Sequence, residues 1–158
     1  MEKLYDAGKL KAIGLSNFDV AQLQNVYDHA RIKPANLQVM CNVYWPQLEL
    51  HKLCKNLNIS FTAYSPLGSP GNRRWGRDRN GQEMGPLNDP VVEQFAEKYR
   101  KTPAQILLRY LIQRGMTAIP KTVRLQRLKE NMDIFDFTLS DNEMETLNSL
   151  RRRARSYG

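Results

Sequence analysis

Apolar residues follow two alternating spacings along this chain, and the alternation predicts short strands separated by helices. Compact runs rich in β-branched and aliphatic residues have the length and composition of buried strands. Longer stretches repeat apolar residues every three or four positions, as one face of a helix does. We expect strands at 11–15, 37–41, 59–64 and 117–120. We expect helices at 19–30, 47–57, 125–132 and 140–150, two more that begin at Asp89-Pro90 and Thr102-Pro103, and a helix tail at 1–8.

Capping residues mark where several of these helices begin. Asp19 precedes the first full helix and has the short acceptor side chain that N-caps require. Thr102 with Gln105, and Ser140 with Glu143, have the spacing of the capping box, in which both side chains bond to backbone N–H groups. These signals predict the starts of three helices independently of the apolar spacing.

Strands that alternate with helices predict parallel βαβ units, and therefore an α/β fold. Four strands, each followed by a helix, amount to half of a (β/α)₈ barrel of the TIM type. The chain has 158 residues, whereas a complete barrel takes about 250. We therefore expect an incomplete barrel over residues 1–150, with an open parallel edge and an uncovered apolar face, and a basic tail at 151–158.

The segment at 65–87 interrupts the alternation with a long loop. It contains five glycines and three prolines. Four arginines also lie in it, at Arg73, Arg74, Arg77 and Arg79. A loop of this length inside a compact domain is typical of a functional lid or of disorder.

Composition favours an ordinary globular protein, with 41% hydrophobic and 25% charged residues. No apolar run approaches the roughly 18 residues of a membrane span, and the charged N-terminus has no signal-peptide core. Cys41 and Cys54 have neither a CxxC nor a zinc spacing, so we expect reduced thiols in a cytoplasmic protein.

The net charge of +8 raises the question of a nucleic-acid partner. Four of the basic residues lie together near the C-terminus, at Arg151, Arg152, Arg153 and Arg155, and without them the net charge is +4. The other basic residues alternate with acids, as on a solvated surface, and this makes nucleic acid an unfavoured partner. Weak binding of RNA or anionic lipid by the basic tail stays open as an alternative.

Five short motifs occur in order along the chain. They are Gly-x-Ser-Asn-Phe at 14–18, Ala-Tyr-Ser-Pro-Leu-Gly at 63–68, Thr-Pro-Ala-Gln-x-Leu-Leu-Arg at 102–109, Ile-Pro-Lys-Thr at 119–122, and Glu-Asn-x-x-x-Phe-Asp-Phe at 130–137. In this order and spacing they resemble the C-terminal, cofactor-binding half of the aldo-keto reductase family, from residue 1 to about 150. The resemblance implies the last four βα units of the barrel, NADP(H) as cofactor, and reduction of a small carbonyl compound to an alcohol.

The resemblance assigns the nicotinamide and pyrophosphate contacts to residues at strand ends. Ser16, Asn17 and Gln38 correspond to the groups that hold the carboxamide, which needs both donors and acceptors. Tyr64 corresponds to the ring that stacks on the nicotinamide, and Ser65, Leu67 and Ser69 to the loop over the pyrophosphate. Judged from the residues alone, a cap or turn at the end of the strand is the favoured role of Ser16 and Asn17, and Tyr64 could be buried in the barrel wall.

The resemblance assigns the 2′-phosphate of NADP(H) to Lys121, Thr122 and Arg127, and the adenine to Glu130 and Asn131. A dianion is bound well by two cations and a hydroxyl donor. The alternative for these residues is an exposed helix with charges at three- and four-residue spacing.

The chain departs from the family pattern in two ways. Where the family often has Glu-Cys-His-Pro, this chain has Met40-Cys41-Asn42-Val43. The resemblance places the catalytic tetrad of aspartate, tyrosine, lysine and histidine in sequence that precedes Met1. We find no catalytic residue and no metal-ligand spacing here; His29 is expected on a surface, and His51 lies in no triad pattern. We therefore expect no turnover from this chain alone.

Three functions remain as hypotheses from the sequence. The first is an NADP(H)-dependent aldo-keto reductase fragment or truncated isoform that keeps its cofactor residues. The second is a non-catalytic module that binds NADP(H) or self-associates through the open barrel edge. The third is an interaction protein that acts through its basic tail.

Overall fold

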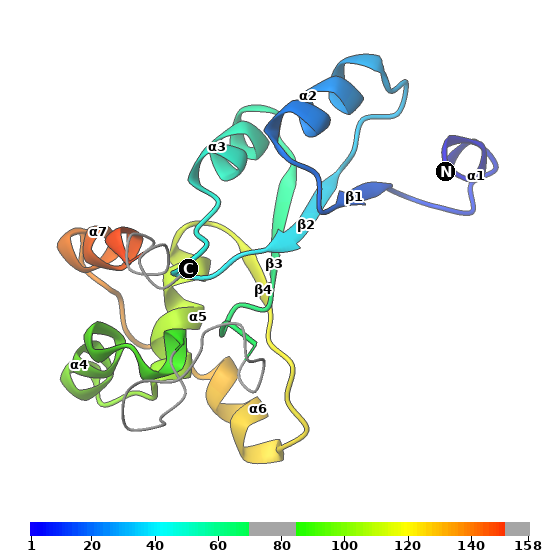
Figure 1. Ribbon diagram of the computed structural model, residues 1–158. Helices are drawn as coiled ribbons and strands as arrows, with labels where there is room; N and C mark the ends of the chain where they lie inside the picture. Colours follow the sequence, from blue (N-terminus) through cyan, green and yellow to red (C-terminus); the bar gives the residue numbers. More distant parts are fainter. Residues whose placement is uncertain (70–84, 151–158) are drawn as a thin grey trace.

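The computed structural model describes residues 1–69 and 85–150 and contains one parallel sheet backed by helices (Figure 1). The four strands pair in the order β1-β2-β3-β4, and every pair is parallel. The strands are β1 (Gly14–Ser16), β2 (Asn36–Met40), β3 (Ser60–Tyr64) and β4 (Thr117–Ile119). The helices are α1 (Glu2–Asp6), α2 (Val20–His29), α3 (Leu48–Asn56), α4 (Pro90–Tyr99), α5 (Pro103–Gln113), α6 (Leu125–Met132) and α7 (Asp141–Ser149), with a 3₁₀ turn η2 (Pro86–Asn88).

The predicted α/β class and the order of elements are confirmed, but three strands are shorter than expected. The strand expected at 59–64 is observed as Ser60–Tyr64. The strand expected at 11–15 is observed as Gly14–Ser16, and the one expected at 117–120 as Thr117–Ile119. A Cβ atom at Gly14 would lie 2.7 Å from the backbone oxygen of Asn36. Glycine is therefore needed where β1 first approaches β2, and pairing begins there rather than at the start of the apolar run.

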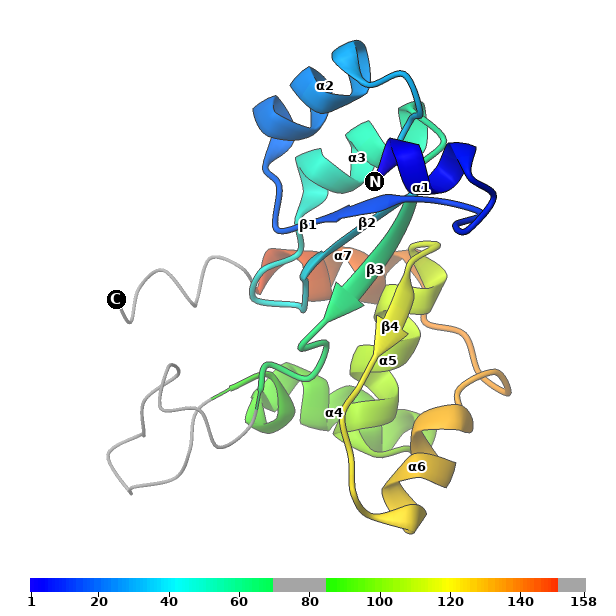
Figure 2. The same ribbon diagram turned by 90° about the vertical axis from the view of Figure 1, so that its right-hand side faces the viewer.

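The two faces of the sheet differ sharply in burial. Leu37, Val39, Phe61 and Ala63 point to the helical side and are buried. Figure 2 shows this arrangement, with the strands in front and helices α3, α5 and α7 behind them. The helices that connect these strands leave the other face uncovered, and we call it the open face. The residues on the open face are Gly14, Ser16, Asn36, Gln38, Met40, Ser60, Thr62, Tyr64, Thr117 and Ile119.

We expected the uncovered face of the sheet to be apolar, and this expectation was wrong, because most side chains on the open face are polar or small. Only Met40, Tyr64 and Ile119 on this open face have large apolar or aromatic side chains. The apolar positions of each strand alternate onto the helical side because successive side chains of a strand point to opposite faces. The open face is consequently polar enough to receive a polar ligand.

Helix α5 contributes more buried core residues than any other helix of the described residues. Ile106, Leu107, Tyr110 and Leu111 are completely buried, and α4 packs alongside them. The capping boxes predicted at Thr102 and at Ser140 are both observed, and Asp19, predicted only as an N-cap, forms a capping box with Gln22. Local sequence signals thus determine where these helices begin.

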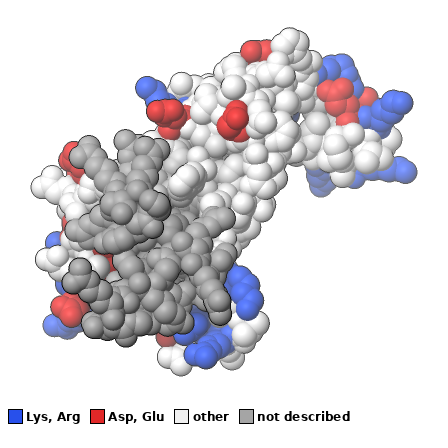
Figure 3. Space-filling view, viewed as in Figure 1, with Lys and Arg blue, Asp and Glu red and all other residues white. Residues whose placement is uncertain are grey.

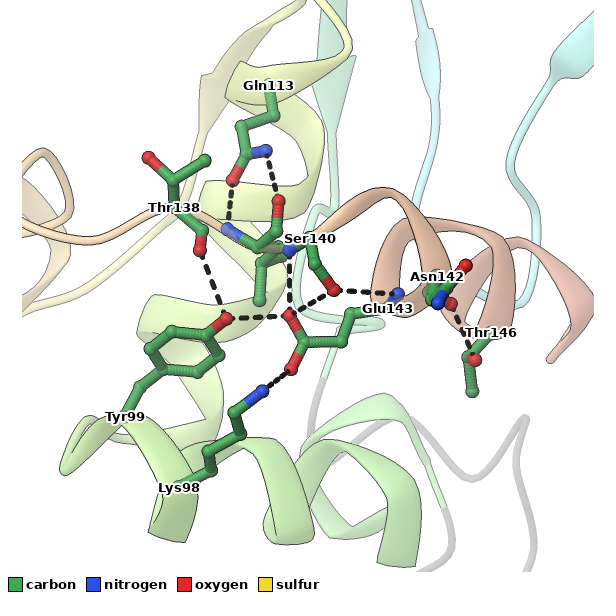
Figure 4. A network of polar contacts seen from close by, with 9 residues as sticks. Lys98, Tyr99, Gln113, Thr138, Ser140, Asn142, Glu143 and Thr146 are labelled. Carbon is green, nitrogen blue, oxygen red and sulfur yellow. Dashed lines mark hydrogen bonds and ion pairs between the residues drawn. The ribbon is translucent and has the colours of Figure 1, made fainter.

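A buried carboxylate joins α4 to α7 (Figure 4). Glu143 accepts hydrogen bonds from Lys98 Nζ at 2.6 Å, from the Tyr99 hydroxyl at 2.6 Å, and from the Ser140 backbone N–H at 2.7 Å. Burial by itself would raise the pKa of Glu143, but these hydrogen bonds outweigh it and lower the pKa to about 2. The carboxylate is therefore held ionised where the two helices meet.

Cys41 and Cys54 are both buried and free, and burial raises the pKa of each thiol to about 11.

No helix of the described residues has the length and apolar character required to cross a membrane. The predicted basic tail at 151–158 lies outside the described residues, as do the four loop arginines between 70 and 84.

Candidate functional site

The predicted carboxamide contacts lie side by side where β1 and β2 end. Ser16 and Gln38 are partners in the parallel register, and the Asn17 backbone N–H donates to the Gln38 carbonyl oxygen at 3.0 Å. The side chains of Ser16 and Gln38 point to the open face, and neither makes a hydrogen bond within the part of the chain that the structure describes. A hydroxyl and an amide are thus adjacent and available to a ligand.

Asn17 and Tyr64 lie next to Ser16 and Gln38 and are joined by a hydrogen bond. The Tyr64 hydroxyl donates to Asn17 Oδ1 at 3.0 Å and so connects the ends of β1 and β3 across β2. Asn17 has a φ of 59°, a left-handed conformation that asparagine tolerates better than most residues. Tyr64 is only half-buried and lies on the open face, so its ring is accessible from that side. Ser16, Asn17, Gln38 and Tyr64 therefore form one cluster, the strand-end cluster.

The segment after β3 turns sharply with several left-handed residues. Ser65, Gly68 and Ser69 have φ values of 49°, 79° and 54°. The Ser69 hydroxyl donates to the Ser65 hydroxyl oxygen at 2.7 Å, and Leu67 packs on the edge of the core. Successive left-handed and turn residues direct backbone N–H groups into a concavity, which suits an anion. The loop continues into residues outside the described part.

The residues predicted to bind the 2′-phosphate lie on the segment that follows β4. Ile119 of β4 pairs with Tyr64, a member of the strand-end cluster. Lys121 follows Ile119 by two residues. Thr122 Oγ1 accepts from the Arg124 backbone N–H at 3.1 Å and holds the turn into α6. Among the described residues, no carboxylate forms an ion pair with Lys121 or Arg127. Figure 3 shows basic side chains at the lower end of the molecule, where α6 lies.

Glu130 and Asn131 lie on the last turn of α6, and both are half-buried. Glu130 accepts from Gln126 Nε2 at 3.0 Å, a contact of the four-residue spacing typical of an exposed helix. Within residues 1–69 and 85–150, no hydrogen bond or ion pair joins α6 to the strand-end cluster. The structure therefore presents two separate groups of predicted cofactor residues on neighbouring strand ends.

Asn42 is a positioning residue that our sequence analysis did not assign. It is completely buried, and its Oδ1 accepts from the backbone N–H groups of Tyr44 at 3.0 Å and Trp45 at 3.1 Å. Its Nδ2 donates to the Ser65 carbonyl oxygen at 3.4 Å, which links the end of β2 to the turn after β3. An asparagine directly after a strand is a typical turn-forming signal, and this signal could have identified it.

Replacing Asn42 by alanine is expected to lower the free energy of unfolding by about 1–3 kcal/mol. The substitution removes the side-chain acceptor of the Tyr44 N–H and the donor to the Ser65 carbonyl oxygen, whereas the Trp45 N–H keeps the Asn42 backbone carbonyl oxygen at 3.0 Å; lost hydrogen bonds and an unsatisfied donor are destabilising by about that amount. Urea unfolding of Asn42→Ala measures the loss, with Asn56→Ala on the exposed end of α3 as the matched control. A loss no larger than that of the control would show that solvent replaces the Asn42 contacts.

The two histidines lie away from the strand-end cluster. His29 is exposed on α2, as predicted. His51 packs edge-on against Phe61, with ring centroids 5.3 Å apart, on the helical side of the sheet. Burial, assisted by the nearby charges of Arg114 and Lys55, lowers the pKa of His51 to about 4, so its imidazole is neutral at pH 7. The described residues contain no group of three or more His, Cys, Asp or Glu side chains that could hold a metal ion.

Comparison with known proteins identifies relatives over nearly the whole chain. The sequence profile of the "Aldo/keto reductase family" matches residues 1–152. The chain is 46% identical over 155 residues to "Aldo-keto reductase family 1 member A1-A" of Danio rerio, covering 98% of this chain and 47% of that protein. It is 43% identical over 155 residues to the Homo sapiens "Aldo-keto reductase family 1 member A1", covering 98% of this chain and 46% of that protein.

Solved structures give the same result for the fold. The aldose reductase of Schistosoma japonicum superposes with a TM-score of 0.80 at 43% identity, over 94% of this chain and 44% of that one. MGS-M4, an aldo-keto reductase from a deep-sea metagenome library, superposes with a TM-score of 0.82 at 37% identity, over 94% of this chain and 51% of that one. The parallel sheet and helices of the present chain are consistent with part of a (β/α)₈ barrel, as predicted. The chain spans about half the length of the curated relatives it matches. The chain belongs to the aldo/keto reductase family.

Proposed function

We propose that this chain is the NADP(H)-binding part of a reductase that converts a carbonyl compound to an alcohol. The family consists of NADP-dependent oxidoreductases. The observation that carries the proposal is the strand-end cluster. There the side chains of Ser16 and Gln38, which form no hydrogen bond with the other described residues, lie beside the Asn17–Tyr64 pair on the open face. Parallel α/β folds bind ligands at this end of their strands.

The chemistry of the cluster fits a carboxamide. A carboxamide presents an N–H₂ donor and a carbonyl acceptor, and the Gln38 amide offers the complementary pair, with the Ser16 hydroxyl as a further donor or acceptor. The Tyr64–Asn17 hydrogen bond of 3.0 Å fixes the phenol, which leaves the ring face for stacking on a planar ligand. When bound, NADPH would supply the hydride that reduces a carbonyl carbon.

The remaining predicted contacts address the phosphates and the adenine. Ser65, Leu67 and Ser69 would contact the pyrophosphate, and Lys121, Thr122 and Arg127 the 2′-phosphate. Glu130 and Asn131 would contact the adenine. Lys121 and Arg127 lack an acidic partner among the described residues, so a phosphate would compete with no internal ion pair there. This set of contacts favours NADP(H) over NAD(H).

In this proposal the proton donor and the rest of the catalytic tetrad come from the part of the relatives that this chain does not match. The carbonyl substrate would bind only when that part is present, and the 158-residue chain alone would bind cofactor without turnover. We propose the cytoplasm as its compartment, on the basis of the two free cysteines.

Calorimetric titration with NADPH tests the proposal without any requirement for catalysis. Gln38→Ala and Ser16→Ala should each weaken NADPH binding by about five- to tenfold, because each removes one hydrogen bond worth about 1 kcal/mol. Ser60→Ala is the matched control, since Ser60 lies on the same open face at the opposite end of β3. Absence of NADPH binding by the folded protein would refute the proposal.

A second candidate function is self-association through the sheet edges. Strands β1 and β4 each pair with one neighbour only within the described sheet, and all pairs are parallel. Such edges favour pairing with another chain, and two copies would supply eight parallel strands. Sedimentation equilibrium distinguishes this candidate, because a monomer of 18.3 kDa at all concentrations would contradict it.

A further inference from the structure

A hollow of about 290 Å³ opens on the helical side of the sheet, between α3 and the end of α5. Its lining consists of Leu48, His51, Lys52, Lys55 and Arg114. The first four lie on α3 at the spacing that places side chains on one helix face, and Arg114 is the C-cap of α5. His51 contacts Phe61, which points away from the open face, so the hollow is separate from the strand-end cluster.

The charges around the hollow are all of one sign. Lys52, Lys55 and Arg114 each lack an ion-pair partner within the described residues, and no acidic side chain lines the hollow. The nearest acid along α3 is Glu49, which lies outside the lining. Converging like charges repel one another, and a bound anion relieves this repulsion.

Arg114 is held in place by neutral groups. Its guanidinium donates to the Pro46 carbonyl oxygen at 2.6 Å and to the Tyr110 hydroxyl at 3.0 Å, and it lies 5.1 Å from the centre of the Tyr110 ring. These contacts fix the side chain without neutralising its charge. The entropy that a flexible arginine loses on binding a ligand is therefore already lost in the folded protein.

Lys55 extends over the turn that follows Arg114. A Cβ atom at Gly115 would lie 3.9 Å from Lys55 Cε, and Gly115 itself has a φ of 81°. The glycine thus permits the tight turn that brings the end of α5 under the lysine. Two helices distant in sequence thereby direct their cations to one place.

We propose that this hollow binds a small phosphorylated compound, with its phosphoryl group between Lys52, Lys55 and Arg114. Three cations match a phosphate dianion better than they match a single carboxylate, and arginine presents a planar set of donors to phosphate oxygens. The volume is close to the lower end of the range for small-molecule sites. Leu48 gives the hollow an apolar side for the carbon part of the ligand.

The two histidines of the chain provide a reporter and an internal control. Inorganic phosphate is added to the intact protein at pH 7 and constant ionic strength, and the imidazole proton resonances are followed by NMR. We expect a saturable shift of His51, which lines the hollow, and no shift of His29, which is exposed on α2. Equal shifts at both histidines, or the same response to acetate or chloride, would overturn the proposal.

Paired charge variants locate the site. Lys52→Gln with Lys55→Gln should weaken phosphate binding about tenfold, because two cationic contacts of modest strength are lost. Lys3→Gln with Lys9→Gln removes the same charge near the N-terminus and should leave binding unchanged. Equal losses in the two double variants would indicate general charge attraction and would contradict a site.

A third variant separates this site from the proposed cofactor contacts. Arg127→Ala should leave the phosphate response of His51 intact, because Arg127 lies on α6 and does not line the hollow. Loss of that response would mean that phosphate acts through the α6 segment, which would also overturn the proposal. The response of His51 requires no NADPH, so failure of the cofactor proposal and failure of this one are distinguishable.

Discussion

Replacing Arg127 by alanine weakens NADPH binding by about ten- to a hundredfold in our expectation, and leaves NADH binding nearly unchanged. A charge-assisted hydrogen bond to a phosphate contributes about 1.5–3 kcal/mol, which corresponds to that range of affinity. NADH lacks the 2′-phosphate and so has nothing to lose at this position. Arg127 is exposed on α6 and forms no ion pair among the described residues, so its removal should leave the fold intact.

Titration calorimetry with both cofactors measures the effect. Lys129→Ala is the matched control, because it removes one positive charge from the same helix at a position outside the predicted contacts. An equal loss in Lys129→Ala would mean that the basic surface attracts NADPH without a specific contact. Equal weakening of NADH would mean that Arg127 acts through the structure of α6.

Replacing Glu143 by glutamine is expected to lower the free energy of unfolding at pH 7 by about 1–2 kcal/mol and to change its dependence on pH. Because the pKa of Glu143 is lowered from 4.5 to about 2 in the folded protein, the ionised carboxylate contributes stability above pH 4.5. That contribution decreases as the pH falls from 4.5 towards 2, where the folded protein also protonates. The magnitude is kept small because Lys98, one of the partners, is 59% exposed and screened by solvent.

Urea unfolding at several pH values between 2 and 7 tests this expectation. The difference between the original protein and Glu143→Gln should be largest at pH 7 and should shrink below pH 4.5. Asp141→Asn removes an exposed acid from the first turn of the same helix and serves as the control. A difference that stays constant over the whole range would show that shape and hydrogen bonding, and not the charge, account for the effect.

Much of the fold follows from local signals in the sequence. The capping boxes at Thr102 and Ser140 join residues three positions apart, so their hydrogen bonds do not depend on contacts with distant segments. Alternation of apolar and polar residues in β2 and β3 likewise fixes which side chains face the helices. Strand length was harder to predict, because the start of β1 depends on how closely Gly14 approaches Asn36 of another strand.

The candidate site divides in the same way. The motifs identified Ser16, Asn17, Gln38 and Tyr64 as candidates, and their position at strand ends brings them together as expected. The role of Asn42 was missed, since its contact with Ser65 joins residues that are 23 positions apart. The cationic hollow was missed for the same reason, because Arg114 comes from a different helix than Lys52 and Lys55.

The sequence by itself determined the α/β class, the family, the helix starts and the candidate cofactor residues, because each of these depends on spacing within a short segment. Only the tertiary structure decided that the open face is polar and that Glu143 is ionised between α4 and α7. It also decided that three cations without an ion pair among the described residues line one hollow. These properties depend on burial and on distances between segments far apart in the chain, and electrostatic interactions vary with both.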